Sequence, residues 1–153
     1  MRTKDVDFIH SILRHPEIYP LITDDGCPPP EEYDVTEIVE RSLCIYLSPN
    51  KYSLFVYRPI TSVTWEVHAN VLKPGRGIEA IRAGRESVQY MFSKTGAQKL
   101  VAYIPVMFPN VLRYSLKVGF EVEGISKKSI RKAGRLYDRC LLGLCKEDWV
   151  WVT

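Results

Sequence analysis

The sequence predicts a single α/β domain over residues 1–153, built on a mixed and mostly antiparallel sheet. Residues 63–71 alternate strictly between apolar and polar side chains, which is typical of a strand with one core face. A helical pattern follows over 78–93, and then the apolar run LVAYI at 100–104, which is typical of a parallel strand covered on both faces. Together these segments predict a central βαβ unit with a right-handed crossover.

The composition fits an ordinary globular protein with one core. Of the 153 residues, 46% are hydrophobic and 25% are charged, and a chain of this length supports a single core. The net charge of +3 is too small to indicate a nucleic-acid partner on its own. No stretch approaches the roughly 20 apolar residues of a membrane span, and the first ten residues lack the apolar core of a signal peptide. We therefore expect a cytoplasmic protein with no membrane partner.

The cysteines do not form a metal motif. No two of them are two residues apart, and none has a histidine at ligand spacing: Cys27, Cys44, Cys140 and Cys145. Zinc sites in proteins usually show such pairs. We therefore expect reduced thiols and no metal.

The N-terminal third should be helical and rich in loops. Thr3 is a suitable cap for a helix that runs through Leu13, and Pro16 should end it near Arg14. Gly26 and three prolines place a loop over 24–34. A short helical piece at 35–42 follows, and then two strands joined by SPNK.

The remaining elements surround the βαβ unit. KPGRG at 73–77 interrupts the alternating strand, and the helix after it should bury one side: Ile78, Ile81, Val88, Met91 and Phe92. A shorter helix over 110–118 should end at Gly119, which suits a helix C-cap. Two strands, 120–130 and 135–145, turn at KAG.

Two segments resemble the GNAT superfamily of acetyltransferases, especially its ribosomal-protein N-terminal acetyltransferase branch. The stronger is 113–149, which has Gly-Phe, Glu-Gly, a hairpin turn, Tyr-Asp-x-x-x-Leu-Gly-Leu and an acidic-Trp ending in register. The weaker is 66–92, where PGRGIEA stands in the place of the family's pyrophosphate loop. The resemblance covers roughly the last two thirds of the chain. It implies the GNAT fold, splayed parallel strands and acetyl-CoA as cofactor.

The glycine loop is the expected cofactor site. The first turn of a helix has N–H groups without internal partners, and its dipole favours an anion. Gly75 and Gly77 would let the backbone approach phosphates, and Arg76 and Lys73 would add positive charge. The other expected cofactor contacts are the preceding strand end, the first helical residue and the family's capping asparagine: Ala69, Asn70, Val71, Ile78 and Asn110. The alternative is that these glycines only form a turn.

Acetyl transfer to an amine needs a base, and the polar face of the 63–71 strand offers Glu66 and His68 on one side. A histidine titrates in the right range, and burial can raise the pKa of a glutamate. The alternative is a solvated sheet face or a structural hydrogen-bond pair. Many members of the family carry a tyrosine acid four residues before the Gly of Gly-Phe. Here Ser115 stands at that position with Tyr114 beside it, so both are candidates. Pro105 should loosen the pairing of its strand.

Two charged clusters and the tail offer surfaces for partners. Basic residues crowd the final hairpin: Lys127, Lys128, Arg131, Lys132 and Arg135. Acidic residues fill the early loop: Asp24, Asp25, Glu31, Glu32 and Asp34. Each cluster is either a solvated surface or a contact, the basic one for phosphate, an acidic substrate or nucleic acid, the acidic one for a cationic amine. The tail WVWV at 149–152 either packs or presents a patch for a protein partner.

The leading functional hypothesis is an acetyl-CoA-dependent N-acetyltransferase. It would transfer an acetyl group to a primary amine, on a protein N-terminus or a small molecule, by direct attack in a ternary complex. The alternative is an inactive GNAT-fold structural or assembly protein of a bacteriophage particle, associated with the virion in head assembly or DNA transfer. Short GNAT-like proteins of tailed bacteriophages resemble this chain loosely. Nucleic-acid binding ranks lower, because the basic hairpin lacks interleaved aromatic side chains.

Overall fold

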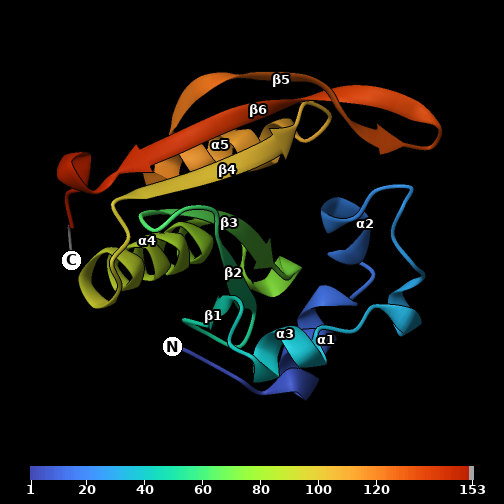
Figure 1. Ribbon diagram of the computed structural model, residues 1–153, viewed down its shortest axis with the longest axis horizontal. Helices are drawn as coiled ribbons and strands as arrows, with labels where there is room; N and C mark the ends of the chain where they lie inside the picture. Colours follow the sequence, from blue (N-terminus) through green and yellow to red (C-terminus); the bar gives the residue numbers. More distant parts are fainter. Residues whose placement is uncertain (152–153) are drawn as a thin grey trace.

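A six-stranded sheet organises the protein, and the computed structural model describes residues 1–151 (Figure 1). The strand order is β1-β2-β3-β4-β6-β5. The strands are β1 (Ile45–Leu47), β2 (Ser53–Pro59), β3 (Thr64–Val71), β4 (Lys99–Pro105), β5 (Glu121–Lys132) and β6 (Arg135–Cys145). All neighbouring pairs are antiparallel except β3 and β4. The mixed, mostly antiparallel sheet with a central βαβ unit is therefore confirmed.

Five α-helices accompany the sheet in the described part of the chain. They are α1 (Val6–Leu13), α2 (Tyr19–Ile22), α3 (Thr36–Glu40), α4 (Ile78–Lys94) and α5 (Pro109–Val118). Single 3₁₀ turns are η1 (Pro30–Glu32), η2 (Lys73–Gly75) and η3 (Lys146–Asp148). Within residues 1–151, no helix has the length and apolar character needed to cross a membrane.

Helix ends follow local chemistry, with one correction at α1. The cap is Asp5 rather than Thr3, because a carboxylate oxygen of Asp5 accepts the Phe8 N–H at 3.0 Å. The Thr3 hydroxyl instead accepts the N–H of Asp5 at 3.1 Å. Gly119 ends α5 with a φ of 130°, as predicted for a glycine C-cap.

The two faces of the sheet bury two separate cores. On one face, α4 and α5 pack on side chains such as Phe55, Tyr57 and Leu100. On the other face, α1 and α3 pack on Tyr46 and Leu54; Figure 1 shows these N-terminal helices beside β1 and β2. β1 and β2 are therefore covered on both faces, and neighbouring residues such as Leu54 and Phe55 are both buried.

The alternation over residues 63–71 predicts the buried positions only in part. Among the apolar positions, Val63 is 43% exposed and Ala69 is exposed as well. Trp65 and Val67 do pack against the first core. The opposite face is closed at Glu66 and Asn70, which are only 5% and 1% exposed, and open at His68 between them. On β4 the prediction of two covered faces is also wrong, since Tyr103 is 37% exposed. The sheet is therefore open beside Tyr103 and closed at two polar positions of β3.

Candidate active site

The parallel strands β3 and β4 pair over only three residues each and then part. Their register runs Thr64–Lys99, Trp65–Leu100 and Glu66–Val101. Beyond that point β3 remains paired with β2, and β4 with β6 as far as Pro105. The opening was predicted, but the reason given for it was wrong. Pro105 is still in register with Arg139, and the strands separate four residues earlier.

A cavity of about 180 Å³ occupies this opening. It is lined from β3 by His68, from β4 by Tyr103, from α5 by Tyr114 and Ser115, and from β6 by Arg139. A second cavity of about 520 Å³ adjoins it and reaches the start of α4. The two share six lining residues: Leu21, Ile22, Ala69, Phe108, Val111 and Tyr114. They therefore form one elongated cleft between the start of α4 and the gap between the strands.

The second cavity collects most of the predicted cofactor residues. Its lining includes the end of β3, the glycine loop and the start of α5: Ala69, Asn70, Val71, Arg76, Gly77 and Asn110. Asn110 does not cap α5 as predicted. The cap position is Phe108, and the Asn110 side chain accepts a hydrogen bond from Arg113.

The two glycines of the loop are needed for different structural reasons. Gly77 is the N-cap of α4 with a φ of 85°, and a Cβ there would meet nothing within 4 Å. Gly75 is buried, and a Cβ there would come within 2.6 Å of the Cβ of Tyr52. Gly75 therefore serves packing, and Gly77 shapes the start of the helix.

The start of α4 offers a suitable surface for an anion. In the described part of the chain, the N–H groups of Gly77, Ile78 and Glu79 have no hydrogen-bond partner. Ile78 is 77% exposed, which corrects its predicted place on the buried side of the helix. Exposed N–H groups and the helix dipole together favour a phosphate there.

The two basic residues of the loop are held differently. The Nε atom of Arg76 donates to the Val71 carbonyl at 3.2 Å, which leaves the guanidinium beside the second cavity. Lys73 pairs with Glu17 instead, through its backbone N–H at 3.0 Å and its ammonium at 3.8 Å. Arg76 is therefore the better placed cation for a phosphate.

Glu66 is a buried carboxylate held between two cationic or titratable side chains. Its Oε2 lies 2.5 Å from Nη2 of Arg58, and its Oε1 lies 3.2 Å from Nε2 of His68. The hydrogen bond with His68 has the largest effect, and that with Arg58 adds to it. Together they outweigh the opposite effect of burial and lower the pKa of Glu66 to about 2. The expectation of a raised pKa for Glu66 is therefore wrong, because the hydrogen bonds outweigh the effect of burial. At neutral pH Glu66 is an ionised partner of His68 and a very weak base.

His68 is the member of this pair that faces the cleft. Its side chain is 47% exposed and lines the first cavity. When Nε2–H donates to Glu66, Nδ1 is left as an acceptor for a proton. The geometry therefore gives the two residues different parts in any proton transfer.

The two α5 hydroxyls that line the first cavity are both already hydrogen-bonded to helix carbonyls. Tyr114 donates to the Ala80 carbonyl at 3.0 Å, and burial raises the pKa of its phenol. Ser115 donates to the Val111 carbonyl at 3.0 Å. A serine hydroxyl rotates easily, whereas the Tyr114 ring is packed against the first core. Ser115 is thus the freer proton donor of the two.

The acidic loop and the basic hairpin bind each other. Both carboxylate oxygens of Asp25 accept N–H groups of the β5–β6 turn, from Ala133 and Gly134, each at 2.8 Å. The ammonium of Lys132 donates to the Thr23 carbonyl at 2.5 Å and to the carbonyl of Pro20. We call these contacts the clasp. It joins the α2 segment, which lines both cavities, to the hairpin above it (Figure 1).

Three site residues were missed by sequence reasoning: Arg58, Tyr103 and Arg139. Arg58 closes the Glu66 pair, and the guanidinium of Arg139 lies 4.7 Å from the centre of the Tyr103 ring. Their strands were predicted, but nothing in the sequence gives the register between β4 and β6. Only that register places Arg139 next to the opening.

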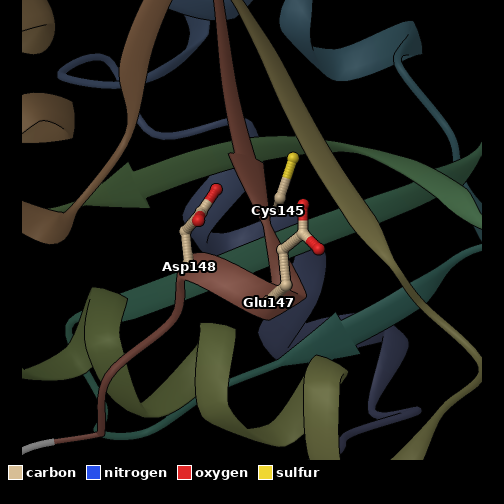
Figure 2. A group of neighbouring side chains, drawn as sticks. All are labelled: Cys145, Glu147 and Asp148. Atoms are coloured by element: carbon tan, nitrogen blue, oxygen red, sulfur yellow. The ribbon is translucent and has the colours of Figure 1, made fainter.

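A group of potential metal ligands lies elsewhere, at the end of β6. Figure 2 shows the side chains of Cys145, Glu147 and Asp148 converging there. The ammonium of Lys99 lies 3.6 Å from the Cys145 sulfur, so a cation already occupies part of this surface. Neither cavity includes these residues, and we assign them no function.

The tail packs on α4 through Trp149. Its ring lies 6.2 Å from that of Phe92 and 4.5 Å from the guanidinium of Arg85, and its Nε1 donates to Gln89 at 2.8 Å. Val150 and Trp151 are 67% and 38% exposed. The last residue of WVWV lies outside the described residues. A protein partner for this tail stays a prediction.

Comparison with solved structures identifies the fold. The chain superposes on spermidine N-acetyltransferase from Vibrio cholerae in complex with CoA and spermine, with a TM-score of 0.76 and 15% identity. The superposition covers 96% of this chain and 93% of that enzyme. The chain is similar to ribosomal-protein-S5-alanine acetyltransferase from Vibrio fischeri over 98% and 92% of the two chains, with a TM-score of 0.74 and 17% identity. No protein-family model and no curated protein matches the sequence.

The chain therefore has the GNAT acetyltransferase fold, as its sequence resemblance predicted. At this level of identity the likeness establishes the fold alone. The bacteriophage alternative finds no support in these likenesses and stays a prediction.

Proposed function

We propose that the protein is an N-acetyltransferase that uses acetyl-CoA and acetylates a primary amine, on a protein N-terminus or a small molecule, by direct attack in a ternary complex. The observation that carries this proposal is the opening between β3 and β4, whose cavity continues to the start of α4. An elongated thioester with a phosphate group at its far end fits such a cleft. The CoA complex of the similar Vibrio cholerae enzyme supports the same reading.

The residues present suit the cofactor at both ends of the cleft. At the start of α4, the free N–H groups and Arg76 would hold the pyrophosphate. Along β3, Ala69, Asn70 and Val71 line the second cavity, and their backbone groups would hold the thioester arm. Lys73 would contribute at most at the rim, because Glu17 holds it. Acetyl-CoA would supply the acetyl group in an activated form.

The chain's own residues would then accept and donate the protons of the reaction. Glu66 would fix the imidazole of His68, whose Nδ1 would accept a proton from the acceptor amine. Ser115 would hold a proton at the inner end of the cavity for the departing sulfur. Tyr114 would form the wall there, because its hydroxyl already donates a hydrogen bond to the Ala80 carbonyl. A backbone N–H at the end of β3 would stabilise the oxyanion.

The direct test is calorimetry of acetyl-CoA binding to the full chain, followed by thiol release in the presence of amines. Binding to the folded state raises its stability, by about 2.7 kcal/mol at a hundredfold excess over Kd, so a thermal shift gives a second readout. Acetyl-dependent thiol release would support the proposal. Absence of binding at millimolar acetyl-CoA would refute it.

A second candidate is a GNAT-fold protein without catalysis that acts as a structural or binding component. The observation in its favour is that both α5 hydroxyls are hydrogen-bonded to helix carbonyls. The same calorimetry separates the two. A protein of this second kind would bind no acetyl-CoA and would instead form a stable complex with a protein partner.

A further inference from the structure

Arg139 presents an unused guanidinium edge to the cleft. It lies on β6 opposite Pro105, on the same face of the sheet as Tyr103. The Tyr103 ring supports the guanidinium at 4.7 Å, and the Ser129 hydroxyl accepts from Nε at 2.9 Å. In the described part of the chain, Nη1 and Nη2 have no hydrogen-bond partner. The side chain is therefore held on two sides while its outer donors remain free.

Within the described residues, the lining of the cleft offers no free negative charge to attract a polycation. Among residues 1–151, neither cavity has an aspartate or glutamate in its lining, whereas Arg76, His68 and Arg139 all contribute. The nearby carboxylate is Glu66, and both of its oxygens are occupied, one by Arg58 and one by His68. One carboxylate of the acidic loop is also occupied, because Asp25 accepts hydrogen bonds from the hairpin turn. A spermidine-like acceptor would therefore bring its charges to a cationic surface.

We propose that the acceptor of this site is an amine that also carries a carboxylate, and that Arg139 binds the carboxylate. This inference rests on the proposed acetyltransferase function. A planar guanidinium with two free donors matches a carboxylate in a bidentate arrangement. Its stacking on Tyr103 fixes that plane before the acceptor arrives.

The layout of the strands also sets a length for the acceptor. His68 stands on β3 and Arg139 on β6, with β4 between them. Two strand spacings amount to about 10 Å, and the parting of β3 and β4 adds to this. The amine and the carboxylate should therefore be separated by several carbons, as in an ω-amino acid or an acidic side chain near a peptide N-terminus.

The test uses the full chain with saturating acetyl-CoA and three kinds of acceptor. These are ω-amino acids of graded length, their matched amides, and spermidine. The acid and the amide of one length have amines of similar basicity, so a difference in kcat/KM reports the carboxylate. We expect the acid to exceed the amide by roughly 10- to 100-fold, the usual effect of a charge-assisted hydrogen-bonded pair, and to exceed spermidine.

Variants assign the effect to Arg139. Arg139→Gln should remove the preference by raising KM for the acid and leaving the amide within about threefold, and Arg139→Lys should restore it only in part. The matched control is Arg135→Gln, an arginine of the same strand that lies 5.8 Å from the Tyr137 ring and lines neither cavity. It should keep the preference. Thermal unfolding of each variant checks that it is folded.

A binding measurement keeps the inference separate from the proposed function. Calorimetry of ω-amino acids, with and without CoA, should show binding that Arg139→Gln abolishes. That result supports the inference even without turnover. Equal use of acid and amide, better use of spermidine, or acid binding that is unchanged in Arg139→Gln would overturn it. Failure of acetyl-CoA to bind would overturn the proposed function alone.

Discussion

The Nε2 atom of His68 lies 3.2 Å from one carboxylate oxygen of Glu66, whose other oxygen lies 2.5 Å from a guanidinium nitrogen of Arg58. Glu66 is 5% exposed, and the imidazole of His68 lines the cleft. One buried charge thus orients the proposed base and is itself neutralised by an arginine. This pairing is the basis of the first two predictions.

Replacement of His68 by alanine should lower turnover by about 10²- to 10⁴-fold, the usual contribution of a general base. Glu66→Gln should lower it less, because the imidazole remains but loses its orientation. Acetyl-CoA affinity, measured by calorimetry, should stay unchanged in both. His15→Ala serves as control, since that histidine lines neither cavity. Unchanged turnover in both site variants would remove this pair from the mechanism.

The stability of the protein should fall as the pH drops from about 5 to about 2. Glu66 has a lowered pKa of about 2 in the folded state against 4.5 as its ordinary value. The stabilisation is complete above the ordinary pKa and is lost as Glu66 becomes protonated, up to roughly 3 kcal/mol. Denaturant titrations across this range should show the loss.

Other carboxylates also have lowered pKa values, namely Glu17, Asp25 and Asp34, so part of the acid sensitivity belongs to them. The difference between the wild type and Glu66→Gln isolates the contribution of Glu66. Parallel pH profiles for the two proteins would show that Glu66 contributes nothing.

Substitution of Gly77 by alanine should weaken acetyl-CoA binding. At a φ of 85° an alanine is strained by on the order of 1–3 kcal/mol, and relief of that strain would turn the first N–H groups of α4. The matched control is Gly134→Ala, which carries a similar strain at a φ of 77° in the hairpin turn, with nothing within 4 Å. Calorimetry should show weaker binding for the first variant only. Equal affinities would place the cofactor elsewhere.

Removal of the Asp25 carboxylate should open the clasp. In Asp25→Ala the N–H groups of Ala133 and Gly134 lose their acceptors, so their amide hydrogens should exchange faster. Asp24→Ala is the control, because the Asp24 carboxylate bonds within its own loop, to the Gly26 N–H at 2.9 Å. Hydrogen exchange measured at these two amides should separate the variants. The prediction fails if both exchange alike.

Alanine at Gly84 should destabilise the protein by about 1–3 kcal/mol. The added Cβ would collide with the Tyr114 hydroxyl and lie 2.9 Å from a methyl carbon of Val118, which would force α4 and α5 apart. The small gain in helix propensity is outweighed. Gly96→Ala, in open space after α4, should be nearly neutral. Urea unfolding of the two variants provides the comparison.

Most elements of this fold are predictable from sequence because they have a local signal, whereas the short helix α2 was not predicted. Gly119 ends α5 and the KAG turn joins β5 to β6 as their residue types predict. The burial of Glu66 and Asn70 has no such signal. It depends on helices α1 and α3 covering a face of the sheet, which is a property of the tertiary arrangement and not of β3 itself.

The residues of the candidate site were predictable where a local pattern within one element carries them, as on β3, in the glycine loop and on α5. Glu66 and His68 were found because alternation places them on one side of β3. Their chemical roles were not, because hydrogen bonds from His68 and from Arg58, which lies on a different strand, lower the pKa of Glu66. Arg139 and Tyr103 meet only through the register of β4 with β6, which no local pattern specifies.

The clasp also has a consequence for the order of assembly during synthesis. The hydrogen-bond donors of Asp25, the N–H groups of Ala133 and Gly134, lie 108 and 109 positions further along the chain and are synthesised later. At ribosomal elongation rates this interval lasts on the order of 5 to 20 s, and contacts of such long range are slow to close. The nascent protein should therefore complete its N-terminal core first and close the clasp last.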